Sequence, residues 1–379
     1  MSLPLEGVLV LDLSRVLAGP YCTMMLGDLG ARVIKVEHPE EGDVTRGWGP
    51  PYHGPTGLSA YYLAVNRNKE SIALDLATPE GAESIRRIAR KADVLVENFP
   101  PGGLERFGLS LETLRAANPR LVTASITGFG RRGPDASAPG FDLLAQAGAG
   151  MMAITGLADG GPTKVGVAVS DLLAGCYAAV GILAALAGRG RPESGRHVEI
   201  DLFSSTLASL INVAQSALMT GREAERHGNA HPQIVPYRTF EASDGAFVLG
   251  VGTDRQFERL AALVGRPDWA GAGPYATNGA RVQKRDALER ELSRIFASEP
   301  RAAWVEKCRA AGIPAGPVRG ALEALGSDTA KALGSVVEKD GVRFVASPIR
   351  VGGAEARLRF PPALDADGER LRREFDLPR

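Results

Sequence analysis

The chain has few cysteines and few histidines. Its 379 residues include three cysteines, Cys22, Cys176 and Cys308, which lie far apart, and five histidines. The odd number of cysteines and the lack of a C-x-x-C spacing argue against a disulfide framework and a zinc site, and favour a reducing compartment. His227 and His231 are four residues apart, but they lie in the loop sequence HGNAHP. The sequence therefore predicts no bound metal.

Net charge and long apolar segments are also lacking. The 44 Lys and Arg residues balance the 44 Asp and Glu residues, so no nucleic-acid partner is expected. The N-terminus has no basic segment followed by an apolar core, and the apolar helix expected near residues 172–187 is short for a membrane span. We expect a cytoplasmic protein without a membrane partner. The P-loop and the nucleophile turn of α/β-hydrolases are absent from the sequence.

Strand and helix patterns alternate over the first third of the chain. The β-rich apolar runs lie at residues 7–14, 31–39, 71–76, 93–99 and 120–130. One intervening segment, TPEGAESIRRIARKA, has Thr78 as its expected helix N-cap and Pro79 at the first helical position. Strands separated by helices of this length predict an α/β fold with a doubly wound parallel sheet.

The rest of the chain suggests further divisions. We predict a large α/β domain over residues 1–200, completed by 326–379, a linker helix over 201–225, and a small α+β domain over 226–325. Residues 202–220 read as one long apolar helix. In the small domain, the Ser-Asp-Gly sequence within YRTFEASDGAFVLGVG predicts a hairpin. We expect the polar final segment, DADGERLRREFDLPR, to lie on the surface.

A single carboxylate interrupts an apolar region. In VGVAVSDLLAG, residues 165–175, the valines and alanines predict a buried strand, and an apolar helix follows Asp171. Because Asp is a preferred N-cap, the local pattern favours Asp171 as the cap of that helix. Asp is also among the residues that are least often buried without a partner, so a functional carboxylate is the alternative.

Polar turns follow several of the predicted strands. They are EHPEEGDVTR, NRNK, VENFPPG and GFGRRGPD. In an open parallel sheet, ligands bind at the carboxyl ends of the strands, where backbone N–H groups and basic side chains can hold phosphate. Each turn alone is typical of a solvated loop, but together they predict a site for a phosphorylated ligand.

Taken together, these stretches resemble the class III CoA-transferases of the formyl-CoA and carnitine-CoA transferase type. The similarity runs over about residues 5–350 through AGPYCTMMLGDLGARVIKVEHPEEGDVTR, NRNKESIALDL, ADVLVENFPPG, GVAVSDLLAG, YATNGARV and GIPAGPV. The resemblance implies a Rossmann-like domain, a smaller α+β domain and an interlocked homodimer. It implies transfer of CoA from an acyl-CoA, expected to be succinyl-CoA, to a carboxylic acid, expected to be a dicarboxylate. CoA is then a substrate, and no separate cofactor is implied.

The resemblance also implies roles for individual residues. Asp171 matches the family's nucleophile, whose carboxylate forms an aspartyl anhydride and then an aspartyl-CoA thioester. The positions that match its CoA and substrate contacts are Leu17, Ala18, His38, Leu74, Asp75, Ala77, Asn98, Phe99, Arg106, Pro139, Gly140, Phe141 and Asp142. Asp142 is equally well explained as the N-cap of a helix in GFDLLAQ. For the distal carboxylate of an acceptor, the candidates are Arg46, His231 and Arg238.

The expected chemistry sets requirements on the surroundings of Asp171. Both intermediates hydrolyse, so the site must exclude water. The helix N-terminus would favour the anionic form of Asp171, and backbone near Gly19 or Gly148–Gly150 is a candidate to hold an oxyanion.

Two alternatives remain open. A 2-methylacyl-CoA racemase of the same fold needs a second proton carrier, and Phe141 stands where racemases have His. A catalytically silent CoA-binding scaffold would lack the nucleophile, whereas Asp171 is present.

Overall fold

The computed structural model describes residues 2–189, 197–353 and 357–378. The described chain forms two compact units. The larger unit comprises Met1–Met151, Lys164–Arg222 and Asp328–Arg379, and the smaller unit comprises Met152–Thr163 and Glu223–Ser327. Residues 190–196 and 354–356, which fall in the predicted large domain, lie outside the described residues. The sequence did not indicate that residues 152–163 join the smaller unit.

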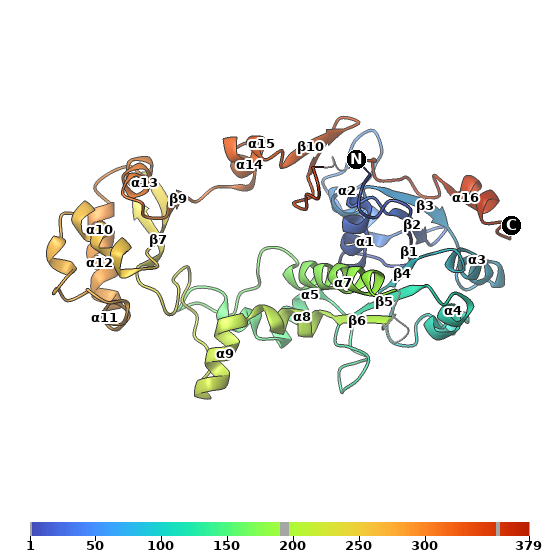
Figure 1. The fold of residues 1–379 in the computed structure, drawn as a ribbon, viewed down its shortest axis with the longest axis horizontal. Helices are drawn as coiled ribbons and strands as arrows, with labels where there is room; N and C mark the ends of the chain where they lie inside the picture. Colours follow the sequence, from blue (N-terminus) through green and yellow to red (C-terminus); the bar gives the residue numbers. More distant parts are fainter. Residues whose placement is uncertain (1, 190–196, 354–356, 379) are drawn as a thin grey trace. The chain divides into compact units, whose positions relative to one another are not determined.

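The larger unit is built on a six-stranded sheet in the order β3-β2-β1-β4-β5-β6 (Figure 1). All its strand pairs are parallel, which confirms the predicted α/β fold. Its strands are β1 (Leu9–Asp12), β2 (Arg32–Glu37), β3 (Lys69–Ala73), β4 (Val94–Glu97), β5 (Val122–Thr127) and β6 (His197–Asp201). The strand order reverses between β1 and β4, and ligands of such sheets bind at the carboxyl ends of the strands near this reversal.

Helices cover both faces of this sheet. α1 (Ala18–Asp28) and α7 (Val169–Ala187) pack together on one face, and α3 (Pro79–Ala89) and α4 (Leu111–Ala117) cover the other (Figure 1). The other helical segments of the unit are η1 (Val44–Gly47), α2 (Ala60–Val65), η2 (Glu105–Phe107), α5 (Asp142–Gly148), α8 (Leu202–Ser209), α9 (Ile211–Thr220), α15 (Asp328–Ala332) and α16 (Gly368–Glu374). α6 (Met151–Ile154) lies at the boundary between the units, and β10 (Val336–Lys339) pairs with β11 (Val342–Val345).

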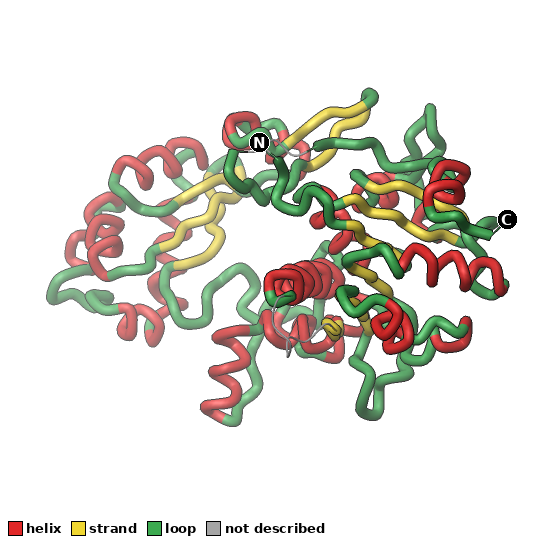
Figure 2. Tube along the Cα trace, turned by 45° about the vertical axis from the view of Figure 1, so that its right-hand side comes forward, coloured by secondary structure: helices red, strands yellow, loops and turns green. Residues whose placement is uncertain are grey.

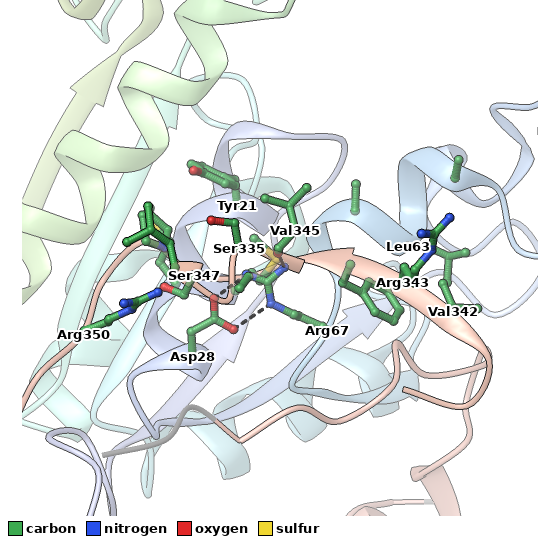
Figure 3. A pocket seen from close by; sticks show the side chains of 18 residues that line it. Tyr21, Asp28, Leu63, Arg67, Ser335, Val342, Arg343, Val345, Ser347 and Arg350 are labelled. Carbon is green, nitrogen blue, oxygen red and sulfur yellow. Dashed lines mark hydrogen bonds and ion pairs between the residues drawn. The ribbon is translucent and has the colours of Figure 1, made fainter. Parts of the chain in front are cut away.

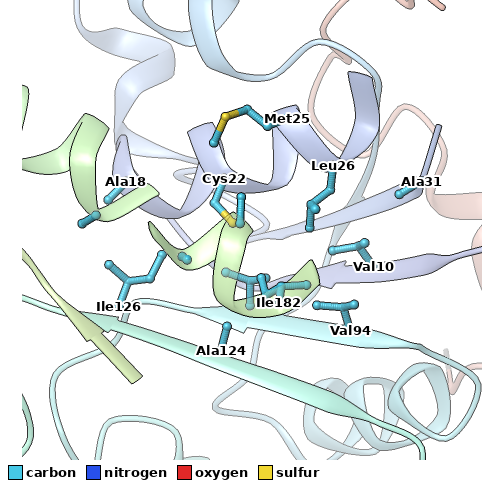
Figure 4. Close-up of a cluster of buried hydrophobic side chains, with 14 of the residues drawn as sticks. Val10, Ala18, Cys22, Met25, Leu26, Ala31, Val94, Ala124, Ile126 and Ile182 are labelled. Atoms are coloured by element: carbon cyan, nitrogen blue, oxygen red, sulfur yellow. The ribbon is translucent and has the colours of Figure 1, made fainter. Parts of the chain in front are cut away.

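The alternation of side chains along the strands produces two separate cores. Val10 of β1 points into the core beneath α1 and α7, where it meets Leu26 and Ile182 (Figure 4). Its neighbour Leu11 points to the opposite face, into the core that contains Ile85 of α3. Because helices cover both faces of the sheet, the central strands β1 and β4 are mainly apolar on both sides.

Helix α3 begins as its sequence predicts. Thr78 is the N-cap, and its hydroxyl accepts a hydrogen bond from the Gly81 N–H at 3.0 Å. Pro79 occupies the first turn, where its missing N–H leaves no helical hydrogen bond unmade.

One sequence-based prediction about helices is wrong, and the prediction for the C-terminal segment holds only in part. Residues 202–220 form α8 and α9, which meet at an angle of 79°, because the backbone turns at Ile211 with a φ of 40°. The polar C-terminal segment does not simply lie on the surface. It forms α16, and Leu371, Phe375 and Leu377 are buried in the core under α3. Polar residues between these three positions hide the apolar pattern in a short sequence.

The smaller unit combines a three-stranded sheet with helices (Figure 2). Its antiparallel strands are β7 (Tyr237–Ala242), β8 (Gly245–Gly250) and β9 (Ala315–Pro317). Its helical segments are α10 (Asp254–Leu263), η3 (Pro267–Trp269), α11 (Asn278–Gln283), α12 (Arg285–Phe296), α13 (Arg301–Ala310) and α14 (Ala321–Leu325). The pairing of β7 with β8 confirms the predicted hairpin. Phe247, Phe257 and Phe296 are fully buried in its core.

Helix α7 is longer than the sequence suggested. It has 19 residues and is long and apolar enough to cross a membrane by these two criteria alone, as are α8 and α9 if they are taken as one span. Ala174, Ala178 and Ile182 of α7 are nevertheless buried against α1 and the sheet. In this fold α7 therefore covers one face of the sheet of an α/β unit.

Candidate active site

A cavity of about 240 Å³ lies at the carboxyl ends of β1, β2 and β3, near the reversal of strand order. Five residues predicted to contact CoA line it, namely His38, Leu74, Asp75, Ala77 and Phe99. The remaining lining residues are Leu13, Arg15, Val36, Glu37, Gly42, Asp43, Leu76 and Phe107. The fold therefore gathers residues from separate strand ends into one mainly apolar cavity, to which two of the four polar turns, EHPEEGDVTR and VENFPPG, contribute.

Asn98 and Arg106 support this cavity from beside it. The Asn98 amide accepts a hydrogen bond from the Arg15 N–H at 2.9 Å and donates one to the Arg15 carbonyl at 2.7 Å. The Arg15 guanidinium lies 5.1 Å from the centre of the Phe99 ring, and the Arg106 guanidinium lies 5.8 Å from that of Phe107. Asn98 thus fixes the turn after β1 through its backbone.

Asp171 lies in the first turn of α7. Both predictions about its local structure are wrong, since residues 161–168 form no strand and the N-cap is Ala168. Within the part of the chain that the structure describes, no strand pairs with this segment, and Val167 is 56% exposed. Asp171 is therefore free of the capping role that its sequence position suggested.

The cap of α7 comes from Asp142 in α5. One Asp142 carboxylate oxygen accepts the Ser170 N–H at 2.8 Å, and the other accepts the Gln146 side-chain amide at 2.7 Å. The prediction that Asp142 caps its own helix is wrong, because the N-cap of α5 is Phe141. Asp142 and Ser170 are 28 residues apart, so no local pattern could reveal this contact.

The two carboxylates at this helix end affect each other. Burial, and secondly repulsion from Asp142, raise the pKa of Asp171 to about 7. The helix N-terminus was expected to favour the anion, but these two effects outweigh it. No side-chain hydrogen bond joins the Asp171 carboxylate to any other residue that the structure describes. Near neutral pH, Asp171 is divided between its acid and its anion.

The start of α1 packs closely on α7. A Cβ atom at Gly175 would lie 2.7 Å from the Ala18 carbonyl oxygen, so the helices can approach this closely only because residue 175 is glycine. Residues four apart share one face of a helix. Asp171 therefore lies one helical turn before Gly175, on the face of α7 that is turned toward α1. Of the predicted contacts, Ala18 thus packs against α7 one helical turn from Asp171, and Leu17 precedes it as the N-cap of α1.

A second close approach places the loop that precedes α5. A Cβ at Gly128 would lie 2.4 Å from the Gly140 Cα, so the chain after β5 and the loop cross backbone to backbone. Gly140 is thus required for the placement of Asp142 beside α7. Pro139 is exposed, and the Phe141 side chain is 62% exposed.

Two of the glycine positions considered for an oxyanion differ in their surroundings. Gly19 lies in the first turn of α1, where a Cβ would clash with the Ser14 side chain at 2.2 Å. Gly148 ends α5, and its nearest neighbours there are Phe129 and Phe203. Only Gly19 lies in the helix start that packs against α7.

Tyr61 of α2 is a residue near this site that the sequence analysis missed. Burial and the carboxylates of Asp171, Asp142 and Asp43 raise the pKa of Tyr61 to about 12. Its ring meets Trp48 edge-on, with 5.2 Å between the ring centres. A phenol with this pKa remains protonated and can donate a hydrogen bond. Nothing in the local sequence AYYLAV distinguishes Tyr61 from a core aromatic residue.

The three candidates for binding the acceptor carboxylate do not lie in one unit. Arg46 belongs to the larger unit, where its guanidinium donates to Glu37 at 2.8 Å and 2.7 Å. His231 and Arg238 belong to the smaller unit. Arg238 forms an ion pair with Glu289 at 2.5 Å and lines a cavity of about 710 Å³. The acceptor role of these residues stays a prediction.

A larger cavity of about 720 Å³ contains none of the predicted site residues (Figure 3). It lies between α1, α2 and the β10–β11 hairpin, with an ion pair of 2.6 Å between Asp28 and Arg67 in its wall. Asp28 is the last residue of α1, at the opposite end of the helix from Ala18. Within the described ranges, no three His, Cys, Asp or Glu residues form a group that could hold a metal ion.

Comparisons with known proteins agree with the sequence motifs. Residues 5–368 match the sequence model of CoA-transferase family III. The succinate–glutarate CoA-transferase of Agrobacterium fabrum is 42% identical over 367 residues, which are 94% of this chain and 92% of that protein. The acetyl-CoA:oxalate CoA-transferase of Acetobacter aceti is 39% identical, over 99% of this chain and 96% of that protein. The crystal structure of a CAIB/BAIF family protein from Brucella suis superimposes with a TM-score of 0.89 and 41% identity, and covers 99% of this chain and 100% of that one.

Proposed function

Because this chain belongs to CoA-transferase family III, and is therefore an enzyme that transfers CoA, we propose that it moves CoA from succinyl-CoA to a dicarboxylic acid. The observation that carries the proposal is Asp171, a carboxylate of raised pKa in the first turn of α7, beside the start of α1. Both curated relatives described above are named for dicarboxylate substrates.

The proposed reaction proceeds through covalent intermediates on Asp171. The carboxylate attacks the thioester carbonyl of succinyl-CoA, the C–S bond breaks, and a mixed anhydride and the CoA thiolate result. The thiolate attacks the aspartyl carbonyl, which releases succinate and leaves an aspartyl-CoA thioester. The acceptor carboxylate then attacks this thioester and expels the thiolate. Attack of the thiolate on the acceptor acyl carbon yields the new acyl-CoA and restores the Asp171 carboxylate.

The charge state of Asp171 suits this chemistry. A carboxylate with a pKa near 7 is a more basic nucleophile than an ordinary one, and it is still largely ionised just above neutral pH. The N-cap of α1, Leu17, offers no side-chain cap, so the N–H groups of Ala18 and Gly19 are available to an oxyanion. We assign these two N–H groups to the thioester carbonyl oxygen.

We assign the nucleotide end of CoA to the cavity at the ends of β1–β3. Its walls include Leu74 and Phe99, which offer apolar surface to the adenine ring. His38 and Arg15 in the same wall can face the phosphates, as can the neighbouring Arg106. The other predicted contacts of this cavity, Asp75 and Ala77, come from the turn after β3.

We also propose that the protein is a cytoplasmic, interlocked homodimer. Helix α9 has no buried residue, although it is largely apolar, and Ile211, Leu218 and Met219 are 74%, 80% and 77% exposed. An apolar surface of this kind on a protein without a membrane role supports a protein partner, for which the second copy is the simplest choice. Cys22, Cys176 and Cys308 are all free thiols, which fits a reducing compartment.

The test is an exchange assay followed by mass spectrometry. The purified protein is incubated with succinyl-CoA and a panel of free mono- and dicarboxylic acids. We expect a new acyl-CoA and a hydroxylamine-sensitive adduct on the Asp171 peptide. A loss of α-deuterium from a 2-methylacyl-CoA, without exchange for any acid, would contradict the proposal and favour racemase chemistry. Binding of CoA with neither reaction would favour the silent scaffold.

A further inference from the structure

The turn between β1 and α1 holds an unusual backbone conformation. Val16 has a φ of 70°, in the left-handed region that β-branched residues rarely adopt. Such conformations persist only where the surroundings impose them, and they are concentrated at functional sites. The surroundings of Val16 therefore identify what enforces this conformation.

A buried ion pair enforces it. Both Asp43 carboxylate oxygens face the Val16 N–H, at 3.4 Å and 3.3 Å. The Lys35 ammonium donates to Asp43 at 2.9 Å and to the Ser14 carbonyl, also at 2.9 Å. The side chains of Lys35 and Asp43 are completely buried. The pair thus binds the turn on both sides of Arg15, whose backbone is held by Asn98.

This arrangement is a costly way to join a strand to a helix. Removing both charges from water costs free energy, and the attraction between them offsets this cost only in part. The presence of such a pair is therefore weak evidence that its role is stability alone. A glycine at position 16 would adopt the same φ without strain or a fixed acceptor. The cost suggests that the position of this turn matters for function.

The turn connects the two parts of the candidate active site. Leu13 and Arg15 line the cavity at the ends of β1–β3. Ala18, just beyond Val16, contacts α7 at Gly175, one turn from Asp171. A change of φ at residue 16 would therefore move the cavity wall relative to the start of α1.

We propose that Lys35 and Asp43 are positioning residues that fix the distance between the nucleotide end of CoA and its thioester. This inference rests on the proposed function. By holding Val16, the pair fixes the position of the nucleotide-binding cavity relative to the N–H groups that face the thioester. Binding energy from the nucleotide can then be used to align the thioester with Asp171.

The proposal predicts a specific dependence on substrate length. Succinyl-CoA spans both parts of the site, whereas succinyl-pantetheine has the same thioester and lacks the nucleotide. For Asp43→Asn, we expect kcat with succinyl-CoA to fall about 100-fold, the size of effect that a small misalignment causes. With succinyl-pantetheine we expect a loss of no more than about threefold, because no nucleotide has to be kept in register.

A matched control separates positioning from general destabilisation. Asp28→Asn also breaks a buried ion pair, with Arg67, but at the far end of α1. We expect it to reduce activity with the two thioesters by the same factor. An equal loss with both thioesters for Asp43→Asn would overturn the proposal.

A further variant keeps the test decisive if Asp43→Asn folds poorly. Lys35→Met with Asp43→Asn leaves neither charge buried without its partner, and the amide keeps an oxygen that can accept the Thr45 N–H. It should fold and still lose activity selectively with succinyl-CoA. Full activity of this folded double variant would overturn the proposal, whereas absence of transfer by the wild-type protein would refute the proposed function itself.

Discussion

The larger unit contains two groups of buried carboxylates that behave in opposite ways. At the carboxyl ends of β1 and β2, Asp12 pairs with Lys69 at 3.1 Å and Asp43 with Lys35 at 2.9 Å. Burial opposes their ionisation, yet the lysines and the hydrogen bonds from neighbouring hydroxyl and backbone groups together hold the pKa of both carboxylates below the usual range. At the start of α7, burial and Asp142 together raise the pKa of Asp171 to about 7.

The difference shows that burial alone does not decide the chemistry of a carboxylate. The group with a cationic partner is held ionised and fixes the shape of the turn after β1. Asp171, beside which Asp142 is a second carboxylate, has a raised pKa, and this basicity suits a nucleophile. Changes at the two places should therefore affect different properties of the protein.

The largest effect is expected at the nucleophile. Asp171→Asn removes the attacking oxygen, and we expect exchange between succinyl-CoA and any acceptor to fall by at least about 10³-fold. The measurement is the rate of formation of new acyl-CoA, with hydroxylamine trapping to follow the adduct. The variant should bind CoA with unchanged affinity, which is the control for folding. Retention of more than a tenth of the wild-type rate would show that another group is the nucleophile.

A loss of stability is the effect expected among the paired charges. Lys69→Met leaves the Asp12 carboxylate buried without its cation, although Thr23 still donates to it at 2.6 Å. We expect the free energy of unfolding to fall by about 3–5 kcal/mol, as measured by urea denaturation. The control is Glu83→Gln, which breaks a surface pair with Arg87 and should change it by less than about 1 kcal/mol. Similar losses for both variants would remove the distinction between buried and exposed pairs.

The pH dependence of stability should distinguish the two groups by its sign. The folded-state pKa of Asp171, about 7, exceeds the value of about 4 for an unfolded chain. The folded protein thus holds a proton that the unfolded chain has lost, and Asp171 lowers stability as pH rises from about 4 to 7. Relative to Asp171→Asn, the wild type should lose about 1–2 kcal/mol between pH 5 and pH 8, a value reduced for the partial exposure of the side chain.

Urea unfolding of both proteins at the same concentration, at each pH, provides this measurement. A difference between wild type and variant that does not change with pH would mean that the pKa of Asp171 is not raised. The lowered pKa values of Asp12 and Asp43 predict the opposite sign. Stability from those two groups is present above the unfolded-state pKa and is lost as the pH falls below it.

The smallest effect is expected from the neighbour of the nucleophile. Asp142→Asn removes the charge that repels the Asp171 anion but keeps an oxygen that can accept the Ser170 N–H. Because the anion is the active form, activity should rise with pH through about 7 in the wild type. In the variant this rise should occur at a pH lower by up to about one unit. An unchanged profile of kcat/KM against pH would show that Asp142 acts only as a cap.

Much of the fold was predictable because it depends on short-range patterns. Apolar strands, the capped start of α3 at Thr78 and the hairpin of the smaller unit each follow from a few neighbouring residues. The family was predictable from several motifs in order, and those motifs also pointed to Asp171. The polar turns indicated a cavity at the strand ends, where five of the predicted residues are found together.

The sequence by itself thus determined the alternation of strands and helices in the first third of the chain, the family and the identity of the expected nucleophile. Only the tertiary structure decided how that residue is held and charged. Asp142 caps α7 from 28 residues away, and Lys35 and Asp43 hold Val16 from the next strand and its turn. The pKa of a carboxylate and the φ of a strained residue depend on distances to groups that are remote in the chain. Folding alone brings those groups within the few ångströms over which hydrogen bonds and buried charges act.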